Sequence, residues 1–130
     1  MNNTVLQVAD SSHPHFAQYG KQFQEKIFQS LLSDHSWASQ MIEVMNPQFF
    51  DLRYLAYLTE KYFSYHVKYK SFPTMSLLIS IVKDDLSQGN DVILRDQIVE
   101  YLHRIKHNPD MGDLQYVKDK SLDFCKRQAF

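Results

Sequence analysis

The chain has 130 residues, the length of one domain, and its formal net charge of -1 excludes a broad basic face that grips a phosphate backbone. Hydrophobic residues make up 44% of the chain and only three residues are glycine, which excludes a disordered chain or a loop-rich sandwich. A single cysteine excludes an intramolecular disulfide, and no apolar run approaches the roughly 20 residues of a membrane span, so we expect a cytoplasmic protein without membrane contact.

The first helix is expected after a polar N-terminal segment. Residues 1–20 show little periodicity and are rich in Asn, Ser and His, so we expect a flexible arm there and a helical domain over residues 21–130. Phe23, Ile27 and Leu31 then recur every four residues, while the polar residues between them fall on other faces. This pattern predicts an amphipathic helix with one face toward a core.

Two further helices are expected before residue 70. Ser36 is a suitable N-cap for a short helix, which should stop at Pro47 because proline disfavours helical geometry in the residue before it. Residues 49–69 carry apolar side chains on more than one stripe. We therefore expect a long central helix there, packed on two sides.

A proline-containing break precedes the next helix. Phe72 and Pro73 interrupt the pattern, and Thr74 can cap a helix over residues 75–86. Four apolar residues are expected to form its buried face: Leu77, Leu78, Ile81 and Val82. Because some residues of this segment are β-branched, a strand is the main alternative. No second strand is predicted to pair with it, so we favour a helix.

The last two expected helices cover residues 92–106, after a cap at Asp91, and residues 113–130. The final helix carries an apolar row formed by Leu114, Val117 and Phe124. The chain ends within this pattern without a stop signal, as in a domain cut from a longer protein. We expect the row to pack on the core or on another copy of the chain, and we predict a single all-α domain of about six helices.

The sequence predicts no catalytic, cofactor-binding or metal site. The three glycines each stand alone at a segment boundary, which is typical of helix ends and not of a loop that cradles phosphates. His103 and His107 have the spacing of two metal ligands on a helix, but cations lie between them and would repel a metal ion. Asp84 and Asp85 point apart on a helix, and Cys125 has no His at helical spacing to act as a base.

Residues 61–70 interleave basic and aromatic side chains, as in proteins that bind single-stranded nucleic acid. Lys61, Lys68 and Lys70 could contact phosphates weakly in this way. On a helix, however, the aromatic residues of the segment follow the helical period, which is the ordinary signal of a core. We favour a mostly inward aromatic row, with weak nucleic-acid contacts as the alternative.

Four patterns carry a family resemblance. The first helix begins near a Gln, has apolar residues at helical spacing and ends near an Asp: Gln24, Ile27, Leu31, Leu32 and Asp34. The long helix has Phe near its start, followed by apolar residues: Phe49, Phe50, Leu55 and Leu58. After the proline break, a polar residue caps a Leu-rich helix: Pro73, Thr74, Leu77 and Leu78. A Tyr-Val pair then starts a charged helix with basic residues: Tyr116, Val117, Lys118, Lys126 and Arg127.

Taken in order, these patterns resemble the N-terminal domain of replicative DNA helicases of the DnaB type, over about residues 23–130. The glycine that is usual in the proline break is absent. Lys70, Ser71 and Phe72 stand in its place, which is similar to the divergent form that phages carry. The resemblance implies a non-catalytic domain without a cofactor of its own, because ATP and Mg belong to another domain of such helicases.

In that family the domain forms the collar of a hexamer, docks primase and sometimes a helicase loader, and is joined by a linker to a RecA-like ATPase. The helix that matches residues 113–130 begins a helical hairpin that pairs protomers. The resemblance thus implies an oligomer or partner interface at Leu114, Val117 and Phe124. It also implies a role in DNA replication in the cytoplasm, which is the host cytoplasm for a phage protein.

The competing hypothesis is a free-standing helical adaptor or a weak single-stranded DNA-binding protein. A small DNA-binding regulator would need a short and strongly basic recognition helix. No segment of the sequence is both short and strongly basic. A regulator is therefore the less favoured form of this alternative.

Overall fold

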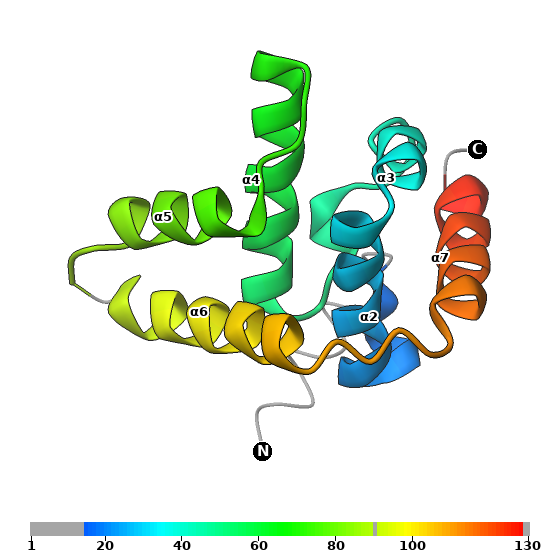
Figure 1. Ribbon diagram of the computed structural model, residues 1–130. Helices are drawn as coiled ribbons and strands as arrows, with labels where there is room; N and C mark the ends of the chain where they lie inside the picture. Colours follow the sequence, from blue (N-terminus) through cyan, green and yellow to red (C-terminus); the bar gives the residue numbers. More distant parts are fainter. Residues whose placement is uncertain (1–14, 90, 129–130) are drawn as a thin grey trace, which may run out of the picture.

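The computed structural model describes residues 15–89 and 91–128, which form helices without a strand (Figure 1). In chain order these are the 3-10 helix η1 (Phe16–Tyr19), α2 (Gly20–Ser33), α3 (His35–Met41), the 3-10 helix η2 (Pro47–Phe49), α4 (Arg53–Tyr69), α5 (Met75–Asp85), α6 (Asp91–His107) and α7 (Leu114–Gln128). The predicted all-α fold is confirmed. The segment for which a strand was the alternative is the helix α5.

The central helix of the fold is α2. It packs against η1, α3, α4 and α7, and its polar residues Gln24, Glu25 and Gln29 are buried together with its apolar ones. The predicted helix with an apolar face toward the core is present, and burial extends to polar positions on its other faces. Helix α4, expected to be central, packs on α2, α6 and η2, but its last turns project beyond the body of the molecule (Figure 1).

The ordered domain begins before residue 21. Residues 1–14 of the expected arm lie outside the described residues, but residues 15–20 are structured and Phe16 is fully buried. Its ring lies 5.1 Å from the ring of Phe50 and 4.9 Å from that of Phe124, measured between centroids. Phe16 fills the space between η2 and α7. The sequence does not reveal this role, because Phe16 is a single apolar residue without periodic apolar neighbours.

Capping side chains set several helix starts. The Thr74 hydroxyl accepts a hydrogen bond from the Leu77 amide at 3.2 Å, so the predicted cap of α5 is confirmed. At α3 the cap is Asp34 and not Ser36, since the Asp34 carboxylate accepts from the Trp37 amide at 3.0 Å. Helix α3 also ends at Met41, earlier than expected.

The long helix α4 is shorter than predicted at its start. Pro47 begins the 3-10 helix η2, which includes Phe49, so α4 itself begins at Arg53. Lys70 ends α4 in the left-handed region, with φ of 62°.

Helix α5 packs along α6 and buries one stripe. Leu78 and Val82 are buried, whereas Leu77 is 41% exposed and Ile81 is only partly buried. Two of the four residues expected on the buried face are therefore not in the core. The reason is that α5 lies at the edge of the bundle, where α6 and side chains of α4 cover only part of its surface (Figure 1).

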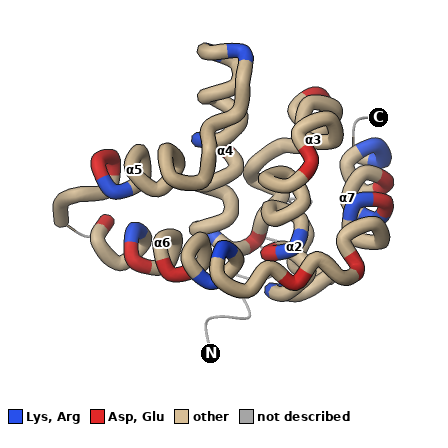
Figure 2. The backbone as a smooth tube through the Cα atoms, viewed as in Figure 1, with Lys and Arg blue, Asp and Glu red and all other residues tan. Residues whose placement is uncertain are grey.

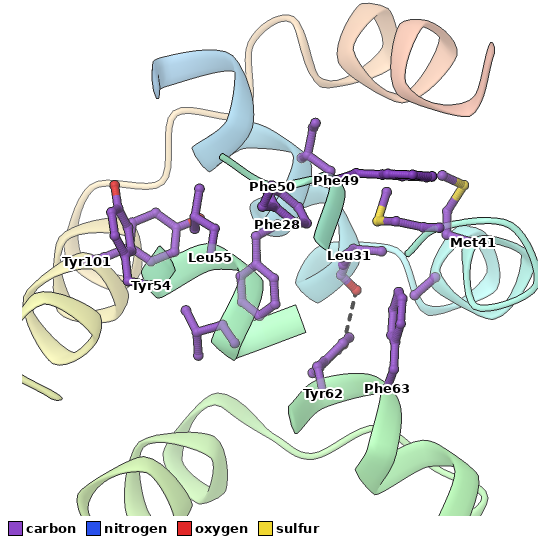
Figure 3. Packing of buried hydrophobic residues seen from close by; sticks show 14 of the residues in the cluster. Phe28, Leu31, Met41, Phe49, Phe50, Tyr54, Leu55, Tyr62, Phe63 and Tyr101 are labelled. Carbon is purple, nitrogen blue, oxygen red and sulfur yellow. Dashed lines mark hydrogen bonds between the residues drawn. The ribbon is translucent and has the colours of Figure 1, made fainter. Parts of the chain in front are cut away.

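The core joins α2 to α3, α4 and α6, as Figure 3 shows. Phe28, Leu31 and Leu55 are fully buried, and the Phe28 ring meets the Tyr62 ring edge to face. The Tyr62 hydroxyl donates a hydrogen bond to the Leu31 carbonyl at 3.0 Å. This bond gives the phenol a partner in an apolar interior, so Tyr62 can be fully buried.

Candidate interaction surfaces

The apolar row of α7 lies inside the chain. Leu114, Val117 and Phe124 are 7%, 2% and 4% exposed. The Phe124 ring lies 4.9 Å from Phe16 and 5.4 Å from Phe49 between centroids, so the row covers the core of its own chain. The sequence left two packings open for this row, on the core of its own chain or on another copy, and the structure shows the first. These three side chains are not an exposed interface, and self-association of the chain stays a prediction.

An ion pair fixes α7 to the start of α3. The Lys118 ammonium donates to the Asp34 carboxylate at 2.9 Å, while the other oxygen of Asp34 caps α3. The hydrogen bond from the Trp37 amide, and then that from Lys118, hold the pKa of Asp34 below its usual value. Asp34 thus joins residues 84 positions apart in the sequence.

The outward face of α7 carries exposed aromatic and charged side chains. Tyr116 is 59% exposed, and the Lys120 ammonium lies 5.9 Å from the centre of its ring. In the last turn of the helix, Arg127 pairs with Asp123 at 3.5 Å. This face mixes both signs of charge, which suits contact with a protein more than contact with nucleic acid.

The three lysines predicted as weak nucleic-acid contacts do not form one cluster. Lys61 turns toward α5, where its ammonium pairs with the Asp85 carboxylate at 2.9 Å. Lys68 and Lys70 are exposed on the projecting end of α4, where Figure 2 shows no acidic residue. Only these last two are available to a partner.

The aromatic row of α4 turns from core to surface along the helix. Tyr62 is fully buried, Tyr65 is partly buried and Tyr69 is 56% exposed beside Val67, which is 61% exposed. The expected inward row is therefore right for Tyr62 and wrong for Tyr69. The last turns of α4 reach past the other helices, so helical period alone could not show where burial stops (Figure 1).

A groove runs beside α4 in two hollows that meet at Glu60. The apolar hollow has a volume of about 380 Å³ and is lined mainly by Ile42, Met45, Pro47, Phe63 and Val67. The polar hollow has a volume of about 360 Å³ and is lined by residues that include Phe50, Asp51, Arg53 and Tyr57. We call the two together the α4 groove.

A polar network closes the junction of α2, α4 and α6, and sequence reasoning missed it. The Arg104 guanidinium donates to both oxygens of the buried Glu25 carboxylate, at 2.8 and 3.2 Å, and also binds Glu100. The Tyr54 hydroxyl donates to Glu25 as well, and the Tyr101 hydroxyl donates to the Glu25 carbonyl. Glu25 and Arg104 are 79 positions apart, and no local pattern predicts their contact.

The hydrogen bonds of this network stabilise the ionised form of the Glu25 carboxyl. Burial raises the pKa of Glu25, but hydrogen bonds from Arg104 and Tyr54 lower it more, so the carboxyl stays ionised well into acid. Burial and the bond to Glu25 raise the pKa of Tyr54. Glu25 and Glu100 are paired with the Arg104 guanidinium, while the neutral hydroxyls of Tyr54 and Tyr101 donate to Glu25.

The structure places the other candidates for chemistry, His103, His107 and Cys125, as follows. No group of three or more His, Cys, Asp or Glu side chains in that part of the chain could hold a metal ion. His103 and His107 stand with ring centroids 6.2 Å apart, and the His107 ring is bonded to the His103 carbonyl at 2.8 Å. Burial raises the pKa of the Cys125 thiol to about 12, which makes it a poor nucleophile.

Comparison with known protein families, with curated protein sequences and with solved structures finds no match to this chain. No helix within residues 15–89 and 91–128 is long and apolar enough to cross a membrane. The family resemblance therefore depends on the sequence patterns of residues 23–130.

Proposed function

We propose that the chain is the non-catalytic N-terminal domain of a phage-type replicative DNA helicase. In this role it assembles copies of the helicase into a collar and docks primase or a helicase loader. ATP and Mg would be used by a separate ATPase domain of the full protein. The domain itself would contribute binding surfaces and no chemistry.

The observation that carries the proposal is the contact between two of the family patterns. Asp34 closes the pattern of the first helix and Lys118 belongs to the pattern of the last, and their side chains pair at 2.9 Å. The residues of the patterns lie on α2, η2, α4, α5 and α7 or directly beside them, and Thr74 caps α5. The contact between Asp34 and Lys118 supports the interpretation that the first and last patterns belong to one domain.

The surfaces left for partners are the outward face of α7 and the projecting end of α4. Because the apolar row of α7 is buried, contact between copies would use exposed side chains such as Tyr116 and Lys120. The exposed tyrosine of this face is of a residue type that is enriched in protein interfaces. A partner other than a second copy would find Val67 and Tyr69 on α4.

The gene that encodes the chain provides the first test. A reading frame that continues past Phe130 into Gly-x-x-x-x-Gly-Lys-Ser/Thr is the expected result, and a stop codon directly after Phe130 would contradict the proposal. The purified chain alone should release no phosphate from ATP, with or without single-stranded DNA. Turnover that a substitution in this chain abolishes would show that the domain is catalytic.

Assembly and partner binding provide the second test. Sedimentation of the chain, alone and with the primase of the same genome, should show self-association or a complex. Tyr116→Asp combined with Lys120→Glu should weaken self-association while the circular dichroism spectrum stays helical. If the wild type is monomeric at high concentration and binds no primase, the free-standing adaptor becomes the better hypothesis.

A second candidate function is weak binding of single-stranded DNA through the projecting end of α4. The observation in its favour is an exposed Tyr69 ring with the Lys68 ammonium 5.3 Å from the ring centre, next in the chain to the exposed Lys70. Two available lysines give few phosphate contacts, so half-saturation should need more than roughly micromolar protein at physiological salt. Tight binding that Lys68→Ala with Tyr69→Ala abolishes would make this the main function.

A further inference from the structure

We propose that the α4 groove is a docking site for the N-terminal segment of the same chain, with Leu6 and Val8 in the apolar hollow and Asp10 near Arg53. The proposal concerns the domain alone and does not depend on the helicase function. Its occupant is a segment of this chain that precedes the described residues.

The apolar hollow has the chemistry of a site that excludes water. Met45 and Phe63 form buried walls, at 4% and 7% exposure, while Val67 at the rim is 61% exposed. Apolar walls gain free energy when apolar side chains displace the water beside them. Glu60 is the one charged residue among those that line this hollow.

The N-terminal segment has side chains that match the hollow. In the stretch Thr4-Val5-Leu6-Gln7-Val8-Ala9, Leu6 and Val8 are two positions apart. In an extended segment such positions lie on one face, so both could enter the hollow together. Two side chains of this size suit a hollow of about 380 Å³.

The place where the described chain begins brings the segment to the groove. Phe16 packs its ring 5.1 Å from that of Phe50, which lines the polar hollow. Seven residue steps separate Val8 from His15, and they span at most about 25 Å. The part of α4 from Ala56 to Val67, beside the two hollows, rises about 17 Å. The segment is therefore long enough to reach the apolar hollow from its own domain.

The charge of Asp10 also matches a cation in the polar hollow. Asp10 lies between His15 and Val8 in the sequence, so a segment docked with Leu6 and Val8 in the apolar hollow would bring Asp10 to the polar hollow. Arg53 is the one cation lining the polar hollow, which Asp51 and Glu60 also line, and it makes no ion pair within the described residues. Asp10 is the only acidic residue of the first fourteen, so it is the partner that the segment can offer.

The first experiment compares the full chain with a chain that lacks residues 2–10. In methyl spectra, the resonances of Ile42 and Val67 should shift between the two chains, while those of Ile93, on α6, should not. Adding a synthetic peptide of residues 1–14 to the shortened chain should move the Ile42 and Val67 resonances back. A peptide with Val5, Leu6 and Val8 replaced by Ser should not. Unchanged Ile42 and Val67 resonances in the shortened chain would overturn the proposal.

A second experiment identifies which copy supplies the segment. The double variant Leu6→Cys with Ser64→Cys should form a disulfide within one chain at least ten times faster than Leu6→Cys with Ser80→Cys, since Ser80 is exposed on α5. Cys125 is buried and should not compete. Equal rates for the two pairs would refute docking. A disulfide that forms only between chains would replace the proposal with exchange of the segment between copies.

Discussion

Two regions of the molecule place a cation against a tyrosine ring, and they use it differently. At the junction of α2, α4 and α6 the Arg104 guanidinium lies 5.5 Å from the centre of the Tyr101 ring, and at the end of α4 the Lys68 ammonium lies 5.3 Å from that of Tyr69. Arg104 is also bound by two carboxylates, and Tyr101 is fully buried. Lys68 forms no ion pair within the described residues, and Tyr69 is exposed. A cation over a tyrosine ring is thus structural at Arg104, where carboxylates complete the contact, and available for binding at Lys68, where they do not.

The largest effect should follow when the junction loses its carboxylate. Glu25→Ala leaves Arg104 and Tyr54 without their shared acceptor, so the free energy of unfolding should fall by about 2 to 3 kcal/mol. This is less than a fully buried pair would lose, because the Arg104 side chain is 44% exposed. Urea unfolding followed by circular dichroism measures the change. Glu43→Ala, at an exposed position of the same residue type, is the control and should change little.

The junction should also give the domain a dependence on pH that the end of α4 lacks. The folded pKa of Glu25 lies below its ordinary value near 4.5, so its contribution to stability is present above that value and lost as pH falls through the folded pKa. Unfolding curves between neutral pH and about pH 3 should therefore show a loss of stability in acid that is smaller in Glu25→Gln. Parallel pH profiles of the two proteins would contradict this assignment.

A smaller effect of opposite sign is expected at Thr59. This residue is fully buried on α4, and its hydroxyl has no hydrogen-bond partner within the described residues, unlike the polar groups of the junction. Thr59→Val keeps the shape of the side chain and removes the unpaired hydroxyl, so it should raise the free energy of unfolding by about 1 kcal/mol. The measurement is the urea concentration at the midpoint of unfolding, which should rise while the dependence of the unfolding free energy on urea stays the same. A destabilised variant would mean that the hydroxyl has a partner such as water.

The smallest effect on stability is expected at the end of α4. Lys68→Ala with Tyr69→Ala should change the free energy of unfolding by less than about 0.5 kcal/mol, since both side chains are largely in solvent. Any loss of partner binding would then reflect contact and not unfolding. Thermal unfolding of this double variant beside Arg104→Ala, which removes the matching cation of the junction, tests the contrast directly. If the double variant and Arg104→Ala were destabilised equally, the end of α4 would be as important for stability as the junction, contrary to this prediction.

Local signals in the sequence predict most of the helices. The proline break at Pro73, the cap at Thr74 and the helical period of Phe23, Ile27 and Leu31 depend on neighbours within a few residues, and the structure confirms each of them. Such signals fix where a helix lies along the chain. They do not fix how many neighbours surround it, which is why α2 and not α4 proved central.

The features that the sequence did not reveal depend on distant contacts. Phe16 belongs to the core only because η2 and α7 meet around it. Glu25 is buried only because Arg104, on another helix, neutralises it. Tyr69 keeps the period of a core residue but lies where α4 has passed the last helix that could cover it. The sequence thus indicated which residue types could form the candidate surfaces. Only the fold shows which of these side chains are exposed.

Asp34 links the position of one helix to the integrity of another. Its two carboxylate oxygens have separate tasks, since one receives the Trp37 amide and the other receives Lys118. A pull on α7 that draws Lys118 away would remove the charge that orients this carboxylate, and the first turn of α3 would loosen. Because Ile42, which lines the α4 groove, directly follows α3, the same carboxylate stands between the C-terminal helix and one wall of the groove.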